Sequence, residues 1–212
     1  MFSEGLAEPL AEGLAGLFSK PVAAQQIRQL LDYLELLDHW SGTYNLTAIR
    51  DPLQMVTRHL LDSLSVMPWI DQGPLLDAGT GAGLPGVPLA IMHPELQVTL
   101  LDSAGKKIRF LNHVARSLEL QNIHPVQDRL ECLTCKKQPS QVISRAFSGL
   151  GDFARAARHL ATAETKLLAM KGKYPEAELE CLPGWLRVDS IEKLTVPGLQ
   201  EDRHLVIMSL IP

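Results

Sequence analysis

The residues with the clearest chemical meaning form one stretch, in which an apolar run ends in an acid and a glycine-rich turn follows: Leu75-Leu-Asp-Ala-Gly-Thr-Gly-Ala-Gly-Leu-Pro-Gly86. Glycine adopts backbone conformations that a Cβ forbids, and it lets a ligand approach the main chain closely. A helix after the turn would direct its free N–H groups and the positive end of its dipole at that ligand. Pro85 suits the first turn of such a helix. The stretch therefore predicts a site for a nucleotide-like cofactor.

The glycine spacing fits two cofactor classes. Gly81-x-Gly83-x-x-Gly86 matches the dinucleotide fingerprint, and Gly79-x-Gly81-x-Gly83 matches the version found in S-adenosylmethionine (SAM) sites. A purely structural strand-to-helix turn would show the same glycines. Taken alone, the pattern leaves all three interpretations open.

Two acids accompany this turn. Asp102 lies 21 residues past Gly81, about where an acid meets ribose in such folds, and a carboxylate can accept from both ribose hydroxyls. It is also placed to cap a helix, and both roles can hold. Asp77 either holds the amino group of a methionine moiety or braces the turn by accepting backbone N–H bonds.

Further candidates follow the next strand-like runs. In Asp128-Arg-Leu-Glu131, Leu130 could pack on an adenine ring while Glu131 or the main chain meets its edge, although a solvated loop has the same composition. Arg145 follows the fourth run. Ligands of open α/β sheets bind outside the carboxyl ends of strands, so we expect Arg145 at the site or on its rim.

Basic residues recur at these strand ends and on the preceding helix: Arg58, His59, Lys106, Lys107, Arg109, Arg145, Lys171 and Lys173. Taken singly, each is consistent with a solvated charge. Together, in a parallel sheet, several would gather on one edge and form a phosphate-binding rim.

The elements that would position these residues follow from hydrophobic periodicity. Three N-terminal helices are expected over 5–19, 22–40 and about 51–67, with Ser41-Gly-Thr43 ending the second. Strands are expected over 75–77, 97–101, 123–127, 141–144, 166–170, 187–194 and 204–211, and further helices over 85–92, 105–119, 149–160 and 175–180. The alternation predicts a mostly parallel sheet covered by helices on both faces, and the last two strands predict an antiparallel finish.

Composition narrows the class of protein. The chain has 212 residues and a formal net charge of −4, which counts against nonspecific RNA binding but not against a local basic rim. No apolar run approaches a membrane span, and acidic residues at positions 4, 8 and 12 argue against a signal peptide. Three cysteines favour a reducing cytoplasm. Cys132-Leu-Thr-Cys135 has zinc or redox spacing, but we expect two reduced thiols and no metal.

Several of these segments, together with others in the chain, resemble one family. They are Tyr44-Asn-Leu-Thr47, Arg58-His-Leu-Leu-Asp-Ser63, Gly79–Gly86, Leu100-Leu-Asp-Ser103, Lys106-Lys-Ile-Arg-Phe-Leu111, Val142-Ile-Ser-Arg-Ala146 and Lys171-Gly172. In this order, over roughly residues 25–208, the chain is similar to the bacterial small-subunit ribosomal RNA guanine-N7 methyltransferases, also called the glucose-inhibited division protein B family. The first 20 residues and the loop at 132–137 fit none of its motifs.

The resemblance implies a class I SAM-dependent methyltransferase fold, Rossmann-like, over residues 71–212, with a helical N-terminal extension over residues 1–70. By position it implies cofactor roles for Gly79, Leu84, Leu130, Glu131 and Arg145, to which the residues themselves add Asp77, Gly81, Gly83 and Asp102. Asn45, Arg58, His59 and Lys171 lie in motifs of the family. We expect them, with Lys106 and Lys107, to face the RNA.

The implied reaction needs no catalytic base, because guanine N7 carries a lone pair and no proton. The protein would mainly hold nitrogen, methyl carbon and sulfur in line. The expected partner is small-subunit ribosomal RNA, free or within a ribosomal subunit or assembly intermediate, and we expect a cytoplasmic monomer. Two alternatives stay open: an NAD(P)-dependent oxidoreductase, and a non-catalytic ribosome assembly factor with a methyltransferase fold.

Overall fold

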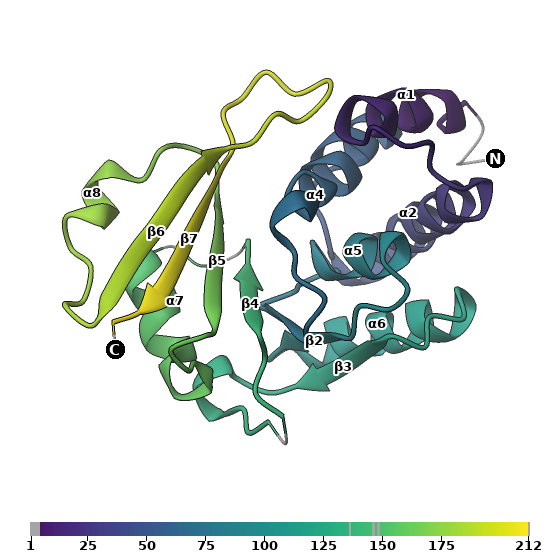
Figure 1. The fold of residues 1–212 in the computed structure, drawn as a ribbon. Helices are drawn as coiled ribbons and strands as arrows, with labels where there is room; N and C mark the ends of the chain where they lie inside the picture. The colour runs from purple at the N-terminus through teal and green to yellow at the C-terminus, as the bar shows by residue number, and fades with distance from the viewer. Residues whose placement is uncertain (1–4, 136, 146, 148, 212) are drawn as a thin grey trace.

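A seven-stranded sheet in the order β3-β2-β1-β4-β5-β7-β6 forms the centre of the protein (Figure 1). The structure is a computed structural model that describes residues 5–135, 137–145, 147 and 149–211. The strands are β1 (Leu75–Ala78), β2 (Val98–Asp102), β3 (Ile123–Gln127), β4 (Gln141–Ser144), β5 (Lys166–Lys171), β6 (Leu186–Lys193) and β7 (His204–Leu210). Strands β1 to β5 pair in parallel, and β7 is antiparallel to both β5 and β6. The predicted sheet and its antiparallel finish are confirmed.

Helices cover both faces of this sheet, as predicted (Figure 1). They are α1 (Ala7–Leu17), α2 (Ala24–Tyr44), α3 (Pro52–Met55), α4 (Asp62–Leu64), α5 (Gly86–Met92), α6 (Gly105–Ser117), α7 (Leu150–Ala157) and α8 (Glu176–Leu179). The π-helical turn η1 (Val56–Leu61) and the 3-10 turns η2 (Met67–Trp69), η3 (Leu130–Cys132) and η4 (Arg158–Leu160) accompany them. Helices α5 and α6 lie on one face with the N-terminal helices, and α7 lies on the other. None of the described helices has both the length and the apolar character required to cross a bilayer.

The strands divide their apolar side chains between two cores. Leu75 and Leu100 belong to the core under α5 and α6, whereas their neighbours Leu76 and Leu101 belong to the core under α7. Successive side chains of a strand point to opposite faces, so a strand buried on both faces must be apolar at nearly every position. This is why the central strands β1, β2 and β5 appear in the sequence as short apolar runs, whereas the edge strands β3 and β6 also carry polar residues.

Helix α2 is joined to the sheet domain by polar contacts as well as by apolar packing. The Gln26 amide donates to the carbonyls of Ile91 and Met92 at the end of α5, and the Gln29 amide donates to Leu118 at the end of α6. These bonds satisfy carbonyls that have no partner within their own helices. The N-terminal helices and the sheet thus share one core, and the division of the chain near residue 70 stays a prediction.

Tyr33 of α2 contacts the glycine loop itself. Its ring is fully buried, and its hydroxyl donates to the Ala82 carbonyl at 2.8 Å. Burial raises the pKa of Tyr33 far above its ordinary value, so the hydroxyl stays a donor. The N-terminal extension therefore supports the loop that the sequence identifies as the cofactor site.

The N-terminal helices depart from the sequence prediction in two places. Helix α2 runs through Gly42 to Tyr44, because one glycine costs a helix only about 1 kcal/mol and the Trp40 and Tyr44 rings stack at 5.3 Å across that turn. Asn45 ends the helix in a left-handed conformation, with φ 50°. The helix predicted to about residue 67 is irregular, with the π-helical turn η1 in its middle. Hydrophobic periodicity does not reveal a single wide turn, and such turns are frequent at functional sites.

We predict that Tyr33→Phe lowers the free energy of unfolding by about 1–3 kcal/mol, because the buried Ala82 carbonyl loses its donor without a compensating water. Urea unfolding measures this change. The same change at the exposed Tyr174 is the matched control and should have no effect beyond error. Equal stability of the two variants would contradict the contact.

Candidate functional site

The glycine loop connects β1 to α5. Gly79, Gly81 and Gly83 have φ angles of 70°, 62° and 99°, which side-chain-bearing residues rarely adopt. A Cβ on Gly83 would lie 2.5 Å from Cγ2 of Val87, so that glycine is also required for close packing. A Cβ on Gly81 would make only an ordinary contact, 3.9 Å from the Gly79 carbonyl oxygen. The loop thus presents bare main chain at the carboxyl end of β1.

Asp77 braces this loop from beneath. The carboxylate is completely buried, and its Oδ2 accepts from Thr80 Oγ1 at 2.6 Å and from the Gly86 N–H at 2.8 Å. Among the described residues, Oδ1 has no hydrogen-bond partner. Burial raises the pKa of Asp77 to about 6, against the lowering effects of the Thr80 and Gly86 hydrogen bonds and of the Arg145 charge. Of the two roles considered for Asp77, the bracing role is present, and contact with a methionine amino group stays a prediction.

Asp102 ends β2 beside the loop. Its Oδ1 accepts from the Ala104 N–H at 2.9 Å, and its Oδ2 accepts from the Gly81 N–H and from Lys107 Nζ, both at 3.0 Å. The bond to Ala104 closes a turn just before α6 and does not cap the helix, because the N-cap of α6 is Ala104 and the helix has no side-chain cap hydrogen bond. The predicted capping role of Asp102 is therefore wrong. Each carboxylate oxygen has about two acceptor positions, so capacity for a ligand hydroxyl remains. Lys107, grouped by sequence with the RNA-facing residues, lies here as the partner of Asp102.

A first cavity of about 360 Å³ lies at the ends of β1, β2 and β3. It is lined by Gly79, Leu101, Asp102, Ser103, Lys107, Asp128, Arg129, Leu130, Glu131 and Phe147. Four of the residues proposed from sequence for the cofactor, Gly79, Asp102, Leu130 and Glu131, meet in it. Leu84 instead packs into the core beneath the loop. We call this space the acidic cavity.

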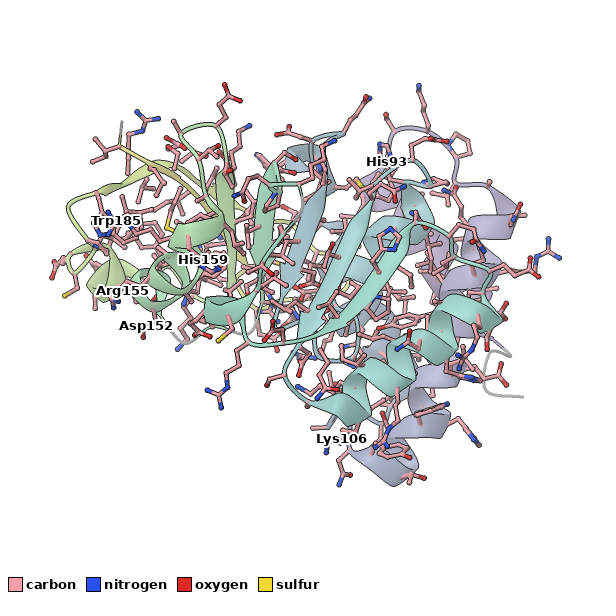
Figure 2. The ribbon with its side chains drawn as sticks, turned by 90° about the horizontal axis from the view of Figure 1, so that it is seen from below. His93, Lys106, Asp152, Arg155, His159 and Trp185 are labelled. Atoms are coloured by element: carbon pink, nitrogen blue, oxygen red, sulfur yellow. The ribbon has the colours of Figure 1, made fainter. Side chains whose placement is uncertain are left out.

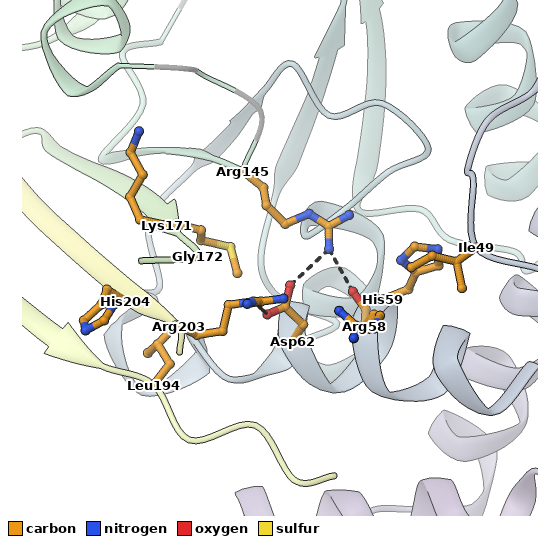
Figure 3. Close-up of a pocket in the computed structure, with 11 residues that line it drawn as sticks. Ile49, Arg58, His59, Asp62, Arg145, Lys171, Gly172, Leu194, Arg203 and His204 are labelled. Carbon is orange, nitrogen blue, oxygen red and sulfur yellow. Dashed lines mark hydrogen bonds and ion pairs between the residues drawn. The ribbon is translucent and has the colours of Figure 1, made fainter. Parts of the chain in front are cut away.

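A second cavity of about 330 Å³ lies beyond the ends of β4 and β5, and Figure 3 shows its lining. Ile49, Arg58, His59, Asp62, Arg145, Met170, Lys171, Gly172, Leu194, Arg203 and His204 surround it. Arg145 and Arg203 converge on one acid: Asp62 accepts from Arg145 Nη1 at 3.2 Å and from Arg203 Nε at 2.9 Å. Four side chains here carry a permanent positive charge against one carboxylate, so we call this space the basic cavity.

His59 lies in the wall of the basic cavity and not on the molecular surface. Its ring is 4% exposed, and Nε2 is 2.9 Å from Thr47 Oγ1. Burial lowers the pKa of His59 to about 4, with a further lowering from Arg145. The ring is therefore neutral near pH 7. It can act on a substrate through its shape and its position, but not through a positive charge.

The remaining basic candidates have different surroundings. Arg58 pairs with Glu201, and Lys171 pairs with Glu178 at 2.8 Å with only 11% of its side chain exposed. Lys106 instead donates to the Tyr44 carbonyl at 3.1 Å. Figure 2 shows Lys106 at the start of α6, on the side of the molecule away from His93. Of these three residues, Arg58 and Lys171 each pair with an acid, whereas Lys106 bonds to an uncharged carbonyl.

Sequence reasoning gave no role to Asp62, Arg203 or His204, which all line the basic cavity. Asp62 lies within the motif that contains Arg58 and His59, so it could have been found there. Arg203 and His204 precede or begin an antiparallel strand. The start of such a strand lies at the same edge as the carboxyl ends of the parallel strands, and this was the available signal.

The cysteines carry no site of their own in the part of the chain described. Cys132 is exposed and Cys135 is half-buried, and both are free thiols. Among these residues, no group of three or more His, Cys, Asp or Glu side chains is placed to hold a metal ion.

The Asp77 carboxyl predicts a pH effect on stability. An acid whose pKa is higher in the folded chain than in the unfolded chain destabilises the fold as it ionises. The stability of the wild type relative to Asp77→Asn should therefore fall as the pH rises from 3.8 to about 6 and then level off. The full change is of order 3 kcal/mol. Urea unfolding across this range measures it, with the exposed Asp152→Asn as control. A difference that grows with pH would contradict the assignment.

Comparison with known proteins places the chain among relatives of similar length. A family model described as GidB, rRNA small subunit methyltransferase G, matches residues 26–206. A relative named ribosomal RNA small subunit methyltransferase G from Stutzerimonas stutzeri (strain A1501) is 51% identical over 210 residues, covering 98% of this chain and 97% of its own. One of the same name from Pseudomonas aeruginosa (strain LESB58) is 50% identical over 203 residues, covering 95% and 94%.

Solved structures agree on the fold. A SAM dependent methyltransferase from Aquifex aeolicus superposes with a TM-score of 0.59 at 16% identity, over 79% of this chain and 98% of that one. TrmN from Thermus thermophilus gives 0.56 at 16% identity, over 81% and 53%. The class I methyltransferase fold predicted from sequence is confirmed. From the match over residues 26–206 and the identity of its relatives, the chain belongs to the rRNA small subunit methyltransferase G family.

Proposed function

We propose that this protein transfers a methyl group from SAM to N7 of one guanine in small-subunit ribosomal RNA. The observation that carries the proposal is the pair of cavities at one edge of the sheet. The segment after β4 separates them, since Arg145 lines the basic cavity and Phe147 lines the acidic cavity. A cofactor bound in the acidic cavity would thus lie next to a positively charged space suited to RNA.

The residues of the acidic cavity fit SAM. Asp102 would accept a ribose hydroxyl, Leu130 would pack on the adenine, and Glu131 would meet the edge of the ring. Asp77 lies outside the lining of this cavity, and its Oδ1, which has no partner among the described residues, would accept from the α-ammonium group directly or through a water molecule. Gly79 and Gly81 would leave room for the cofactor against the main chain.

Bound SAM supplies a methyl group on a positively charged sulfur, which an unshared nitrogen electron pair can attack without prior loss of a proton. The protein then has to align the nitrogen, the methyl carbon and the sulfur, and to neutralise the negative charge of the RNA. Asp62 holds Arg145 and Arg203 at the wall of the basic cavity, where their charges can face phosphates or the O6 of guanine. His59, being neutral, would shape the space for the base.

Neither alternative function is favoured by the relatives and the fold, and one experiment tests all three. The purified protein is incubated with SAM labelled on its methyl group and with small-subunit ribosomal RNA from cells that lack this protein. We expect label at one guanine N7. An oxidoreductase or a non-catalytic assembly factor would transfer none. Monomeric state, cytoplasmic location and absence of a metal stay predictions.

Asp102→Asn tests the cofactor site. The amide keeps the size of the side chain but removes the charge and one acceptor, and a hydrogen bond to a charged group contributes about 1.5–3 kcal/mol. We expect SAM affinity to fall roughly 10–100-fold by calorimetry, with the fold intact by circular dichroism. Asp152→Asn, at an exposed pair with Arg155, should leave the affinity unchanged. Unaltered binding by Asp102→Asn would remove the ribose assignment.

Charge removal tests the RNA side. We expect Arg58→Gln and Lys106→Gln each to weaken RNA binding and to reduce the slope of log affinity against log salt by about 0.7–0.9 per lost phosphate contact. Filter binding at several salt concentrations measures this. Lys166→Gln is the matched control, because that lysine lies at the start of β5, at the opposite edge of the sheet, and pairs with Asp71. Equal slopes in all three variants would show that the basic rim does not bind RNA.

A further inference from the structure

Tyr174 is an exposed aromatic residue at the edge of the basic cavity. It follows Lys171-Gly172-Lys173 at the end of β5, and 54% of it is accessible to solvent. The other two tyrosines are engaged: Tyr33 is buried, and Tyr44 is stacked on Trp40 with Arg109 over its ring. Burying the Tyr174 ring would gain hydrophobic energy that the free protein does not obtain.

The ring is held at the cavity by His204. Their centroids are 5.7 Å apart and their planes meet at 85°, the edge-on arrangement that aromatic pairs favour. His204 is 8% exposed and lines the basic cavity, and it lies opposite Lys171 in the β5–β7 ladder. Figure 3 shows His204 beside Arg203 in this wall. Tyr174 is therefore exposed to solvent and in ring contact with a residue of the cavity wall.

The charge beside the ring suits a nucleic acid strand. Lys173 is exposed, and in the described ranges it has no acidic partner, unlike Arg58, Arg145 and Lys171. Single-stranded nucleic acids bind where cations follow the backbone and aromatic rings receive the bases. Such stacking contributes about 1–3 kcal/mol per base, and it requires an unpaired base.

We propose that Tyr174 is the stacking platform for an unpaired base of the RNA next to the methylated nucleotide, with Lys173 contacting the adjoining phosphate. The proposal rests on the proposed function for its partner. It adds a base-binding position outside the cavity that would receive the target. Stacking there would hold the strand open, so that the target base can enter the basic cavity alone.

The test compares Tyr174→Leu, which keeps apolar bulk, with Tyr174→Phe and Tyr174→Trp, which keep an aromatic ring. The ligands are single-stranded octaadenylate, small-subunit ribosomal RNA from cells lacking the protein, and heparin, a polyanion without bases. We expect Tyr174→Leu to bind both RNAs roughly 5–150-fold more weakly, the factor that corresponds to about 1–3 kcal/mol. Heparin affinity should not change, and the two aromatic variants should bind as the wild type does.

Ile211→Ala is the matched control, because Ile211 is another exposed apolar residue but follows the far end of β7. It should leave every affinity unchanged. Unaltered RNA binding by Tyr174→Leu would overturn the proposal, and so would an equal loss of heparin binding or a loss in Tyr174→Phe and Tyr174→Trp. Octaadenylate binding needs no methyl transfer, so this readout is independent of the test of the proposed function.

Discussion

The carboxylate of Asp77 is the interaction on which the candidate site depends. One oxygen accepts from Thr80 inside the glycine loop and from Gly86 at the start of α5, so a single buried atom fixes both ends of the turn. Gly86 has to be glycine, since a Cβ there would lie 2.7 Å from that same oxygen. Because the Asp77 carboxyl is buried away from solvent, its pKa is raised. The shape of the acidic cavity follows from this arrangement.

Charge divides the edge of the sheet into two regions. Acids gather where a ribose and an ammonium group would bind, and cations gather where phosphates would bind. Arg145 stands between them: it is held by Asp62, and its charge also acts on Asp77. Opposite charges on neighbouring cavities would keep a cationic cofactor and an anionic strand in their own places, because each region repels the ligand of the other.

The sequence was sufficient for features that depend on local pattern. Apolar runs predicted the strands. The spacing from Gly81 predicted that Asp102 lies beside the loop, and the hydrogen bond from the Gly81 N–H to Asp102 shows that it does. Contacts between residues that are far apart in the sequence could not be predicted from local pattern. The contact of Asp62 with Arg203 joins residues 141 positions apart, and the local sequence around either residue does not identify the other as its partner. Lys107 stays a predicted RNA-facing residue, but its position in the sequence did not reveal that it pairs with Asp102.

The amide contacts of α2 have a consequence for synthesis of the chain. Gln26 and Gln29 bond to helix ends at residues 91, 92 and 118, so the partners of α2 leave the ribosome only after many further residues are made. Until then the part of α2 that packs on α5 and α6 has nothing to cover it, although α1 already precedes α2 in the chain and packs on it. During synthesis α2 can therefore complete its packing only after the chain up to residue 118 has left the ribosome.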